Sequence, residues 1–515
     1  MNGAGMRDEE EGEAPGPPVR EPSLLDSIVP LVVLATLVAG SLALFGLDAL
    51  DGPVQVALVL CAMAAALVAM KNGHPWSAVQ QAGRRALSSI TSAVFILLAV
   101  GALIGVWNLS GTIPTLVYYG IQVLSPSWYY AATAVICGAI ALSIGSSWTT
   151  AGTIGVGLVG VADMLGVSTA ITAGAVISGA YLGDKLSPLS ETTVLTAQMV
   201  KADVHEHIKR QAWTSLPAFV IAFAVFLVIG LVKSADVVNP VGEEIELARL
   251  GDIYHITPLN LLPLVLLAFL SVKKVPASIA LIGSAIFAGV LGAFLQPSVM
   301  RDFVAGSGGV VLESLKGIWL AMANGFSIQS GIPLIDRLLS RGGMDSMLLT
   351  LWLIIGAVTF GAVLEEFGLI ARLVDPLIRS AKSTGRLFLT VFACAFGLNL
   401  VAGDQYIALV LPSRVFRLEF EKRGLAPTNL SRLCADSGTV TSALVPWNSC
   451  GAFMGAVLGV PTLTYAPFAI FNYASPALSV LYGITGFKIE KIAPPEAGPV
   501  TGSEGGSGSG ASIGQ

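Results

Sequence analysis

Long apolar stretches recur along almost the whole chain, and they constrain the fold more than any other feature of the sequence. A helix of about 20 apolar residues crosses roughly 30 Å of hydrocarbon, where every backbone polar group must be bonded within the protein. Stretches of this length begin near Ser27 and continue to about residue 486. Because 54% of the 515 residues are hydrophobic and 12% are charged, the composition excludes most soluble enzymes. We predict an all-α polytopic membrane protein with roughly 10 to 13 transmembrane helices.

The ends of the chain and its cysteines do not indicate a functional site. Residues 1–22 are acidic and rich in Gly and Pro, and residues 494–515 are mainly Gly, Ser and Pro, so we predict disordered tails at 1–22 and 487–515. The first apolar stretch is long enough to span, which favours a membrane helix over a cleaved signal peptide. Five scattered cysteines have no metal-ligand spacing, and no basic groove for nucleic acid is visible. We therefore expect neither a cofactor nor a nucleic-acid partner.

An internal repeat organises the chain into two related halves. Four pairs of residues share an offset of 258 to 260 positions: Gly101 with Gly361, Gly145 with Gly403, Ser178 with Ser437, and Pro188 with Pro446. Transporter folds are often built from such repeats. The predicted organisation is N-terminal helices with an interfacial helix (23–88), repeat 1 (89–233), connecting loops and linking helices (234–345) and repeat 2 (346–486).

The distribution of charge predicts that the two halves run in opposite directions through the membrane. Residues 108–127 carry no charge, whereas the matching segment 367–386 holds four basic residues, and cytoplasmic segments are enriched in Lys and Arg. This pattern indicates inverted repeats. The basic residues between Arg414 and Arg432 also look cytoplasmic, which fits only if the chain after Gly403 re-enters the membrane. The sequence leaves that point open.

Four carboxylates lie inside or beside apolar sequence: Asp184, Glu191, Asp404 and Asp436. A charged group within the membrane costs at least a few kcal/mol, so each is a functional hypothesis. They lie near expected breaks in helices or re-entrant hairpins, at Gly145-Ser146, Pro188, Gly403 and Pro446. Free carbonyls and helix ends at such breaks bind ions or substrates. The expected supporting oxygen ligands are Ser187, Ser190, Thr192, Thr439, Thr441, Asn448 and Ser449.

Structural roles for these carboxylates stay open. Asp184 could form an ion pair with its neighbour Lys185, and Glu191 could be a first-turn acid after Ser190 as helix cap. Asp404 and Asp436 could be loop residues near basic groups such as Arg432. His205 and His207 lie in a charged stretch and are expected to be solvated.

Oxygen-rich clusters of this kind suit a hard cation such as Na⁺, and a buried carboxylate can hold either a cation or a proton. The chain has no G-x-x-x-x-G-K phosphate-binding loop, so the expected driving force is an ion gradient. A channel would not need proline-broken halves. An enzyme would need a nucleophile and a base, which the sequence does not bring together.

Three motifs resemble the NhaC family of Na⁺/H⁺ antiporters: A-G-A-V-I-S-G-A-Y-L-G-D-K-L-S-P-L-S-E-T-T (173–193), D-Q-Y-I-A-L-V-L-P (404–412) and N-L-S-R-L-C-A-D-S-G-T-V-T-S-A-L-V-P-W-N-S-C-G (429–451). The resemblance implies inverted repeats with broken helices and marks Asp184, Asp404, Asp436 and Asn448 as matching positions. Glu191 and Ser449 stand where relatives carry Asp and Thr.

The resemblance also implies a multi-pass protein of a prokaryotic cytoplasmic membrane that exchanges Na⁺ or Li⁺ for H⁺. The transported ions and the lipid bilayer are its implied partners, and transported Na⁺ is the only expected metal. The alternative is a Na⁺- and H⁺-coupled exchanger of organic anions or amino acids, of the malate/lactate type. A homodimer is left open.

Overall fold

The computed structural model describes residues 19–233, 249–305 and 309–492, and every regular element in these residues is a helix. Most of the two predicted tails, at 1–18 and 493–515, lies outside the described residues. Within the predicted C-terminal tail, residues 487–492 run beside the turn after residue 422. There the Ile492 amide donates to the Gly424 carbonyl at 2.8 Å, and Leu425 and Lys491 form an isolated β-bridge.

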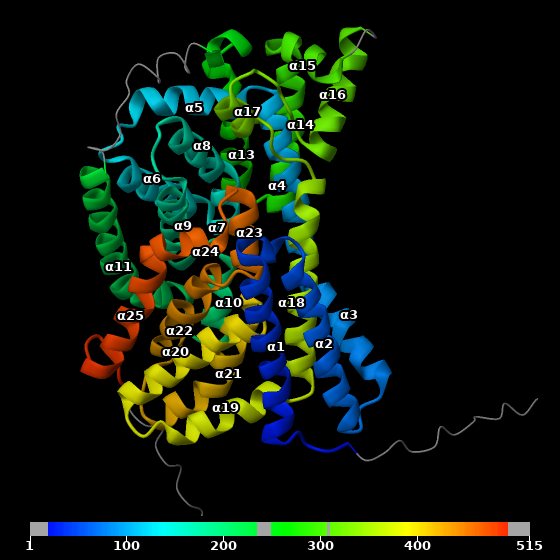
Figure 1. The fold of residues 1–515 in the computed structure, drawn as a ribbon. Coiled ribbons are helices and arrows are strands. Elements are labelled where there is room, and N and C mark those ends of the chain that lie inside the picture. Colours follow the sequence, from blue (N-terminus) through cyan, green and yellow to red (C-terminus); the bar gives the residue numbers. More distant parts are fainter. Residues whose placement is uncertain (1–18, 234–248, 306–308, 493–515) are drawn as a thin grey trace, which may run out of the picture.

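The helices fall into four consecutive groups (Figure 1). The N-terminal group is α1 (Leu24–Phe45), α2 (Pro53–Lys71) and α3 (Trp76–Ser89). The first repeat comprises α4 (Thr91–Leu109), α5 (Thr112–Val123), α6 (Tyr129–Ile144), α7 (Ser147–Thr150), α8 (Val156–Met164), α9 (Thr169–Leu186), α10 (Glu191–Met199) and α11 (Val204–Lys233). The connecting group is α13 (Leu262–Val272), α14 (Ala277–Leu295), α15 (Pro297–Val304), α16 (Val310–Asn324) and α17 (Pro333–Leu339). The second repeat comprises α18 (Leu348–Glu366), α19 (Leu369–Ser380), α20 (Thr384–Val401), α21 (Gln405–Lys422), α22 (Pro427–Cys434), α23 (Ser449–Leu458), α24 (Thr462–Tyr465) and α25 (Ile470–Thr485).

The described helices confirm an all-α protein with many membrane spans. Seven are long and apolar enough to cross a membrane, and an eighth span is possible where α23 and the stretch Thr462–Phe468 meet at 88°. This number is below the 10 to 13 predicted from apolar windows. The windows measure hydrophobicity alone, whereas Gly and Pro divide several of them into helices shorter than 18 residues.

The two repeats contain corresponding elements in the same order. Helices α4 and α18 have 19 residues each, and the amphipathic helices α5 and α19 that follow them have 12 each. Figure 1 places α5 near one end of the molecule and α19 near the opposite end. Matching order with opposite placement is the arrangement expected of an inverted repeat.

A helical hairpin with a glycine at its tip lies inside each repeat. In the second repeat, α20 and α21 fold back on each other at Gly403, whose φ is +62°, and the Arg423 guanidinium donates to the Ala381 carbonyl. In the first repeat, α6 and the α7–α8 segment reverse at Gly145, whose φ is +80°. The two ends of the second hairpin therefore lie together, so the chain after Gly403 re-enters and its basic residues return to the end where α20 begins.

Candidate functional site

The tip of each hairpin packs against the helix break of its own repeat. A Cβ atom on Gly145 would lie 2.7 Å from the Cβ of Leu189, in the break between α9 and α10. At the corresponding place in the second repeat, the Ser449 amide donates to the Gly403 carbonyl at 2.9 Å. Glycine is required at both tips because positive φ and close contact leave no room for a side chain.

Polar side chains cap the four helices that begin at these tips and breaks. Ser146 accepts from the Thr149 amide at the start of α7, and Asp404 accepts from the Ile407 amide at the start of α21. Ser190 and Asn448 cap α10 and α23 in the same way. Each pair of caps occupies equivalent positions in the two repeats, and each cap is, or lies within two residues of, a residue predicted at a helix break.

Asp184 lies near the end of α9 in a cluster of hydroxyl groups. Its side chain accepts from Ser147 Oγ, in the hairpin tip, and from Ser190 Oγ at 3.3 Å, while Thr193 Oγ1 donates to the Asp184 carbonyl at 2.6 Å. Thr192 Oγ1 lies 3.0 Å from Ser190 Oγ. Asp184 is buried, and among the described residues it has no basic partner within ion-pair distance. This centre offers oxygen atoms to a cation and little else.

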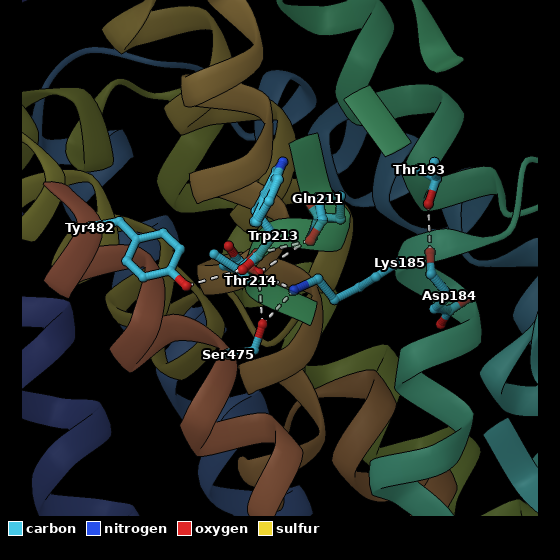
Figure 2. A network of polar contacts seen from close by, with 9 residues as sticks. Asp184, Lys185, Thr193, Gln211, Trp213, Thr214, Ser475 and Tyr482 are labelled. Atoms are coloured by element: carbon cyan, nitrogen blue, oxygen red, sulfur yellow. Dashed lines mark hydrogen bonds and ion pairs between the residues drawn. The ribbon is translucent and has the colours of Figure 1, made fainter. Parts of the chain in front are cut away.

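Lys185, the next residue, points to a different partner (Figure 2). Its Nζ forms an ion pair with Asp436 Oδ1 from the other repeat, and both side chains are fully buried. Ser475 Oγ donates to the same oxygen at 2.7 Å, and Gln211 Nε2 donates to it at 3.3 Å. The alternative of a Lys185–Asp184 ion pair is therefore wrong, and Lys185 instead joins the two repeats.

Asp436 lies in a π-helical turn, Ala435–Thr439, that continues α22. Its second oxygen, Oδ2, is buried and accepts no hydrogen bond from the described residues. Arg432, one turn earlier, is also fully buried; its Nη1 donates to the Lys488 carbonyl at 3.2 Å, whereas Nε and Nη2 have no partner there. Two buried cations, Lys185 and Arg432, thus accompany one buried carboxylate.

Asn399 holds the second break in place. Its Nδ2 donates to Thr441 Oγ1 at 2.9 Å and to the Gly438 carbonyl at 2.7 Å, and Asn448 Nδ2 donates to Asn399 Oδ1 at 3.1 Å. Among the predicted oxygen ligands, Thr441 and Asn448 are therefore engaged in this network. The hydroxyl of Thr439 is buried without a partner among the described residues.

The remaining predicted residues lie at the same tips and breaks. Asp404 is buried and serves as the cap of α21, while Glu191 is exposed at the start of α10 and accepts from Tyr406 Oη at 3.1 Å. Ser187 Oγ accepts from the Leu189 amide within the first break. Among the described residues, each of the four carboxylates therefore has its own hydrogen-bond partners. Asp404 shares no partner with Asp184 or Asp436 there.

Three residues of α11 were misjudged or missed from the sequence. His207, expected to be solvated, is fully buried with Nδ1 2.8 Å from Ser431 Oγ, and Gln211 reaches Asp436. The signal was present, because His207, Gln211 and Ser215 recur every four residues and so share one helix face. A polar stripe on one face of an apolar span indicates a buried polar contact.

The site lies where the two repeats meet. The Trp148 ring from the first hairpin tip stacks on the Phe453 ring of α23, with centroids 4.0 Å apart. Tyr181 Oη lies 3.4 Å from Ser442 Oγ. Together with the Lys185–Asp436 pair, these contacts cross between the repeats around the oxygen-rich centre.

Comparison with known proteins shows which family has this architecture. Residues 23–213 and 179–487 match the model of the Na⁺/H⁺ antiporter family. The chain is 35% identical to the Na⁺/H⁺ antiporter NhaC of Alkalihalophilus pseudofirmus, over 85% of this chain and 91% of that protein. It is 33% identical to a malate-2H⁺/Na⁺-lactate antiporter of Bacillus subtilis (91% and 96%). It is 31% identical to the arginine/ornithine antiporter ArcD of Halobacterium salinarum (93% and 96%). The chain, a multi-pass membrane transporter and a secondary antiporter, belongs to the Na⁺/H⁺ antiporter family.

Proposed function

We propose that this antiporter exchanges Na⁺ or Li⁺ for H⁺ by alternating access. The observation that carries the proposal is the Asp184 centre, a buried carboxylate surrounded by hydroxyl groups and without a basic partner among the described residues. Hard monovalent cations prefer oxygen ligands, and a carboxylate that holds no internal cation is available to an external one. The similarity to NhaC of Alkalihalophilus pseudofirmus supports the same ions.

The proposed ion- and proton-binding set is Asp184, Glu191, Asp404 and Asp436, with Asp184 as its principal cation ligand. The hairpin tips supply the discontinuous helices at which transporters of inverted-repeat design bind their ions. If the two repeats move against each other only when the site is loaded, binding on one side becomes exchange between the two sides. Lys185 and Trp148 contact the other repeat, so such a movement would change their contacts.

A second candidate is exchange of organic anions or amino acids, and the buried cations favour it. Lys185 and Arg432 outnumber Asp436, and a substrate carboxylate would balance the remaining charge. Relatives with such substrates are the malate-2H⁺/Na⁺-lactate antiporter of Bacillus subtilis and ArcD of Halobacterium salinarum. We place this candidate second because Lys185 is already paired with Asp436.

Purified protein in proteoliposomes with an internal pH dye tests the proposal. Na⁺, Li⁺, K⁺, malate, lactate and arginine are added in turn, and we expect Na⁺ or Li⁺ alone to drive proton movement. The Asp184→Asn variant should lose this response. The matched control is Asp252→Asn, an exposed acid outside the site, which should keep it. A response that requires an organic acid or arginine would establish the second candidate instead.

A further inference from the structure

A stripe of buried polar side chains lies between α11 and α25, helices that pack side by side. Its members are wholly buried and recur at helical spacing on the two facing surfaces, with Asp436 beside them. We call this set the polar seam: His207, Gln211, Ser215, Ser475, Ser479 and Asp436. Figure 2 shows its centre, where Gln211, Ser475 and Lys185 converge.

The seam contains polar atoms that nothing in the described protein satisfies. His207 Nε2, Gln211 Oε1, Ser215 Oγ, Ser479 Oγ and Asp436 Oδ2 are buried without a hydrogen-bond partner there. Buried polar groups are normally bonded, because each unmet group is costly, and ordered water is the usual partner where protein groups are missing. Five such atoms in one seam are the pattern that ordered water between the two helices would satisfy.

The outer end of the seam reaches the basic face of the molecule. Arg210, beside Gln211 on α11, forms an ion pair of 2.6 Å with Glu490, and both side chains are partly exposed. Arg432 contacts the Lys488 carbonyl at the same end. By the positive-inside rule this face is cytoplasmic.

The inner end of the seam is Asp436, and its two oxygens differ. Oδ1 accepts from Lys185, Ser475 and Gln211, whereas Oδ2 accepts from none of the described residues. The charged or titratable groups around it are Lys185 from α9, Arg432 and Cys434 from its own helix, and His207 from α11. On α25, Tyr482 lies beyond Ser479 and faces Arg432.

From this arrangement we propose that the polar seam conducts protons between the cytoplasmic face and Asp436, by a route separate from the cation centre at Asp184. The inference rests on the proposed Na⁺/H⁺ exchange. A proton arriving through the seam binds Asp436 Oδ2 and forms the carboxylic acid, while Lys185 remains an ammonium ion on Oδ1. Release returns the proton to seam water and restores the carboxylate. Chains of carboxyl, imidazole and water groups are the usual proton relays of membrane proteins.

Hydroxyl-radical footprinting tests the hydration of the seam without reference to any substrate. Radicals produced by X-ray pulses form from bound water and label side chains beside it. We expect labelling of His207 although its side chain is fully buried, and none of Phe226, which is equally buried further along α11. Equal protection of His207 and Phe226 would overturn the proposal.

A plug variant tests conduction. Ser479→Leu fills the seam between Asp436 and the outer face, and it should lower the maximal Na⁺/H⁺ exchange rate by about tenfold. The KM for Na⁺ should stay unchanged because the Asp184 centre is untouched. Ala222→Leu is the matched control, since it adds similar bulk to a buried apolar position of α11.

The outcomes separate the two proposals. An unchanged rate in Ser479→Leu, or an equal loss in Ala222→Leu, would refute proton conduction through the seam while leaving Na⁺/H⁺ exchange intact. Wild-type protein that moves no protons with Na⁺ or Li⁺ would refute the proposed function, and labelling of His207 would then report a hydrated seam that serves another substrate. Loss of His207 labelling in Ser479→Leu, together with the slower rate, is the result that we expect.

Discussion

Replacing Lys185 by Met isolates the energetic role of the one fully buried ion pair in the described structure. The Lys185 and Asp436 side chains both have 0% exposure, and methionine keeps most of the length of lysine without its charge. Among the described residues, the Asp436 carboxylate would then retain only Ser475 and Gln211 as donors. Removing one partner of a buried pair typically costs about 3–5 kcal/mol, because the other charge remains in a medium of low polarity.

Two further variants show whether that loss comes from the unpaired charge. Lys185→Met combined with Asp436→Asn removes both charges of the pair, so it should recover part of the stability lost in the single variant, while the buried Arg432 then lacks a nearby carboxylate. Lys71→Met breaks the ion pair with Asp26 at the protein surface, where the lysine side chain is 70% exposed. That control should cost no more than about 1 kcal/mol.

The five cysteines provide the assay. All are buried and free, so a thiol-reactive fluorescent dye reports unfolding of the detergent-solubilised protein as it is heated. The midpoint temperature should fall much further for Lys185→Met than for Lys71→Met, and the double variant should recover part of the loss. Equal midpoints for Lys185→Met and Lys71→Met would mean that Lys185 does not reach Asp436, and the reasoning would fail.

Three other changes test the site. Ser147→Ala removes a hydrogen bond to the Asp184 carboxylate and should raise the KM for Na⁺ in proteoliposomes by about tenfold; an unchanged KM would remove Ser147 from the cation centre. Gly145→Ala should lower the thermal midpoint more than Gly166→Ala, because both have positive φ but only Gly145 has Leu189 within contact. Equal shifts would argue against the packed hairpin tip. Combining Trp148→Ala with Phe453→Ala in a double-mutant cycle should give a coupling of about 1 kcal/mol by the same dye assay, and additive effects would contradict the stack between repeats.

The hairpin tips and helix breaks could be predicted because their signals are local. Gly145 and Gly403 adopt the positive φ that glycine tolerates, and Pro188 and Pro446 lie in the breaks where a helix cannot continue. Their near-constant offset made the repeat visible even though the surrounding residues differ. The number of spans was less predictable, since an apolar window does not reveal where a hairpin turns back.

The partners of the buried charges depend on contacts between distant segments of the chain, and a hydropathy profile does not predict such contacts. Lys185 and Asp436 are 251 residues apart, and only the packing of α9 against the other repeat brings them together. One part of the answer nevertheless follows from helix geometry alone. Successive residues of an α-helix point about 100° apart and do not face each other, which by itself argues against a Lys185–Asp184 pair. The same geometry makes the end of α9 a rigid link between the cation centre at Asp184 and the carboxylate of Asp436.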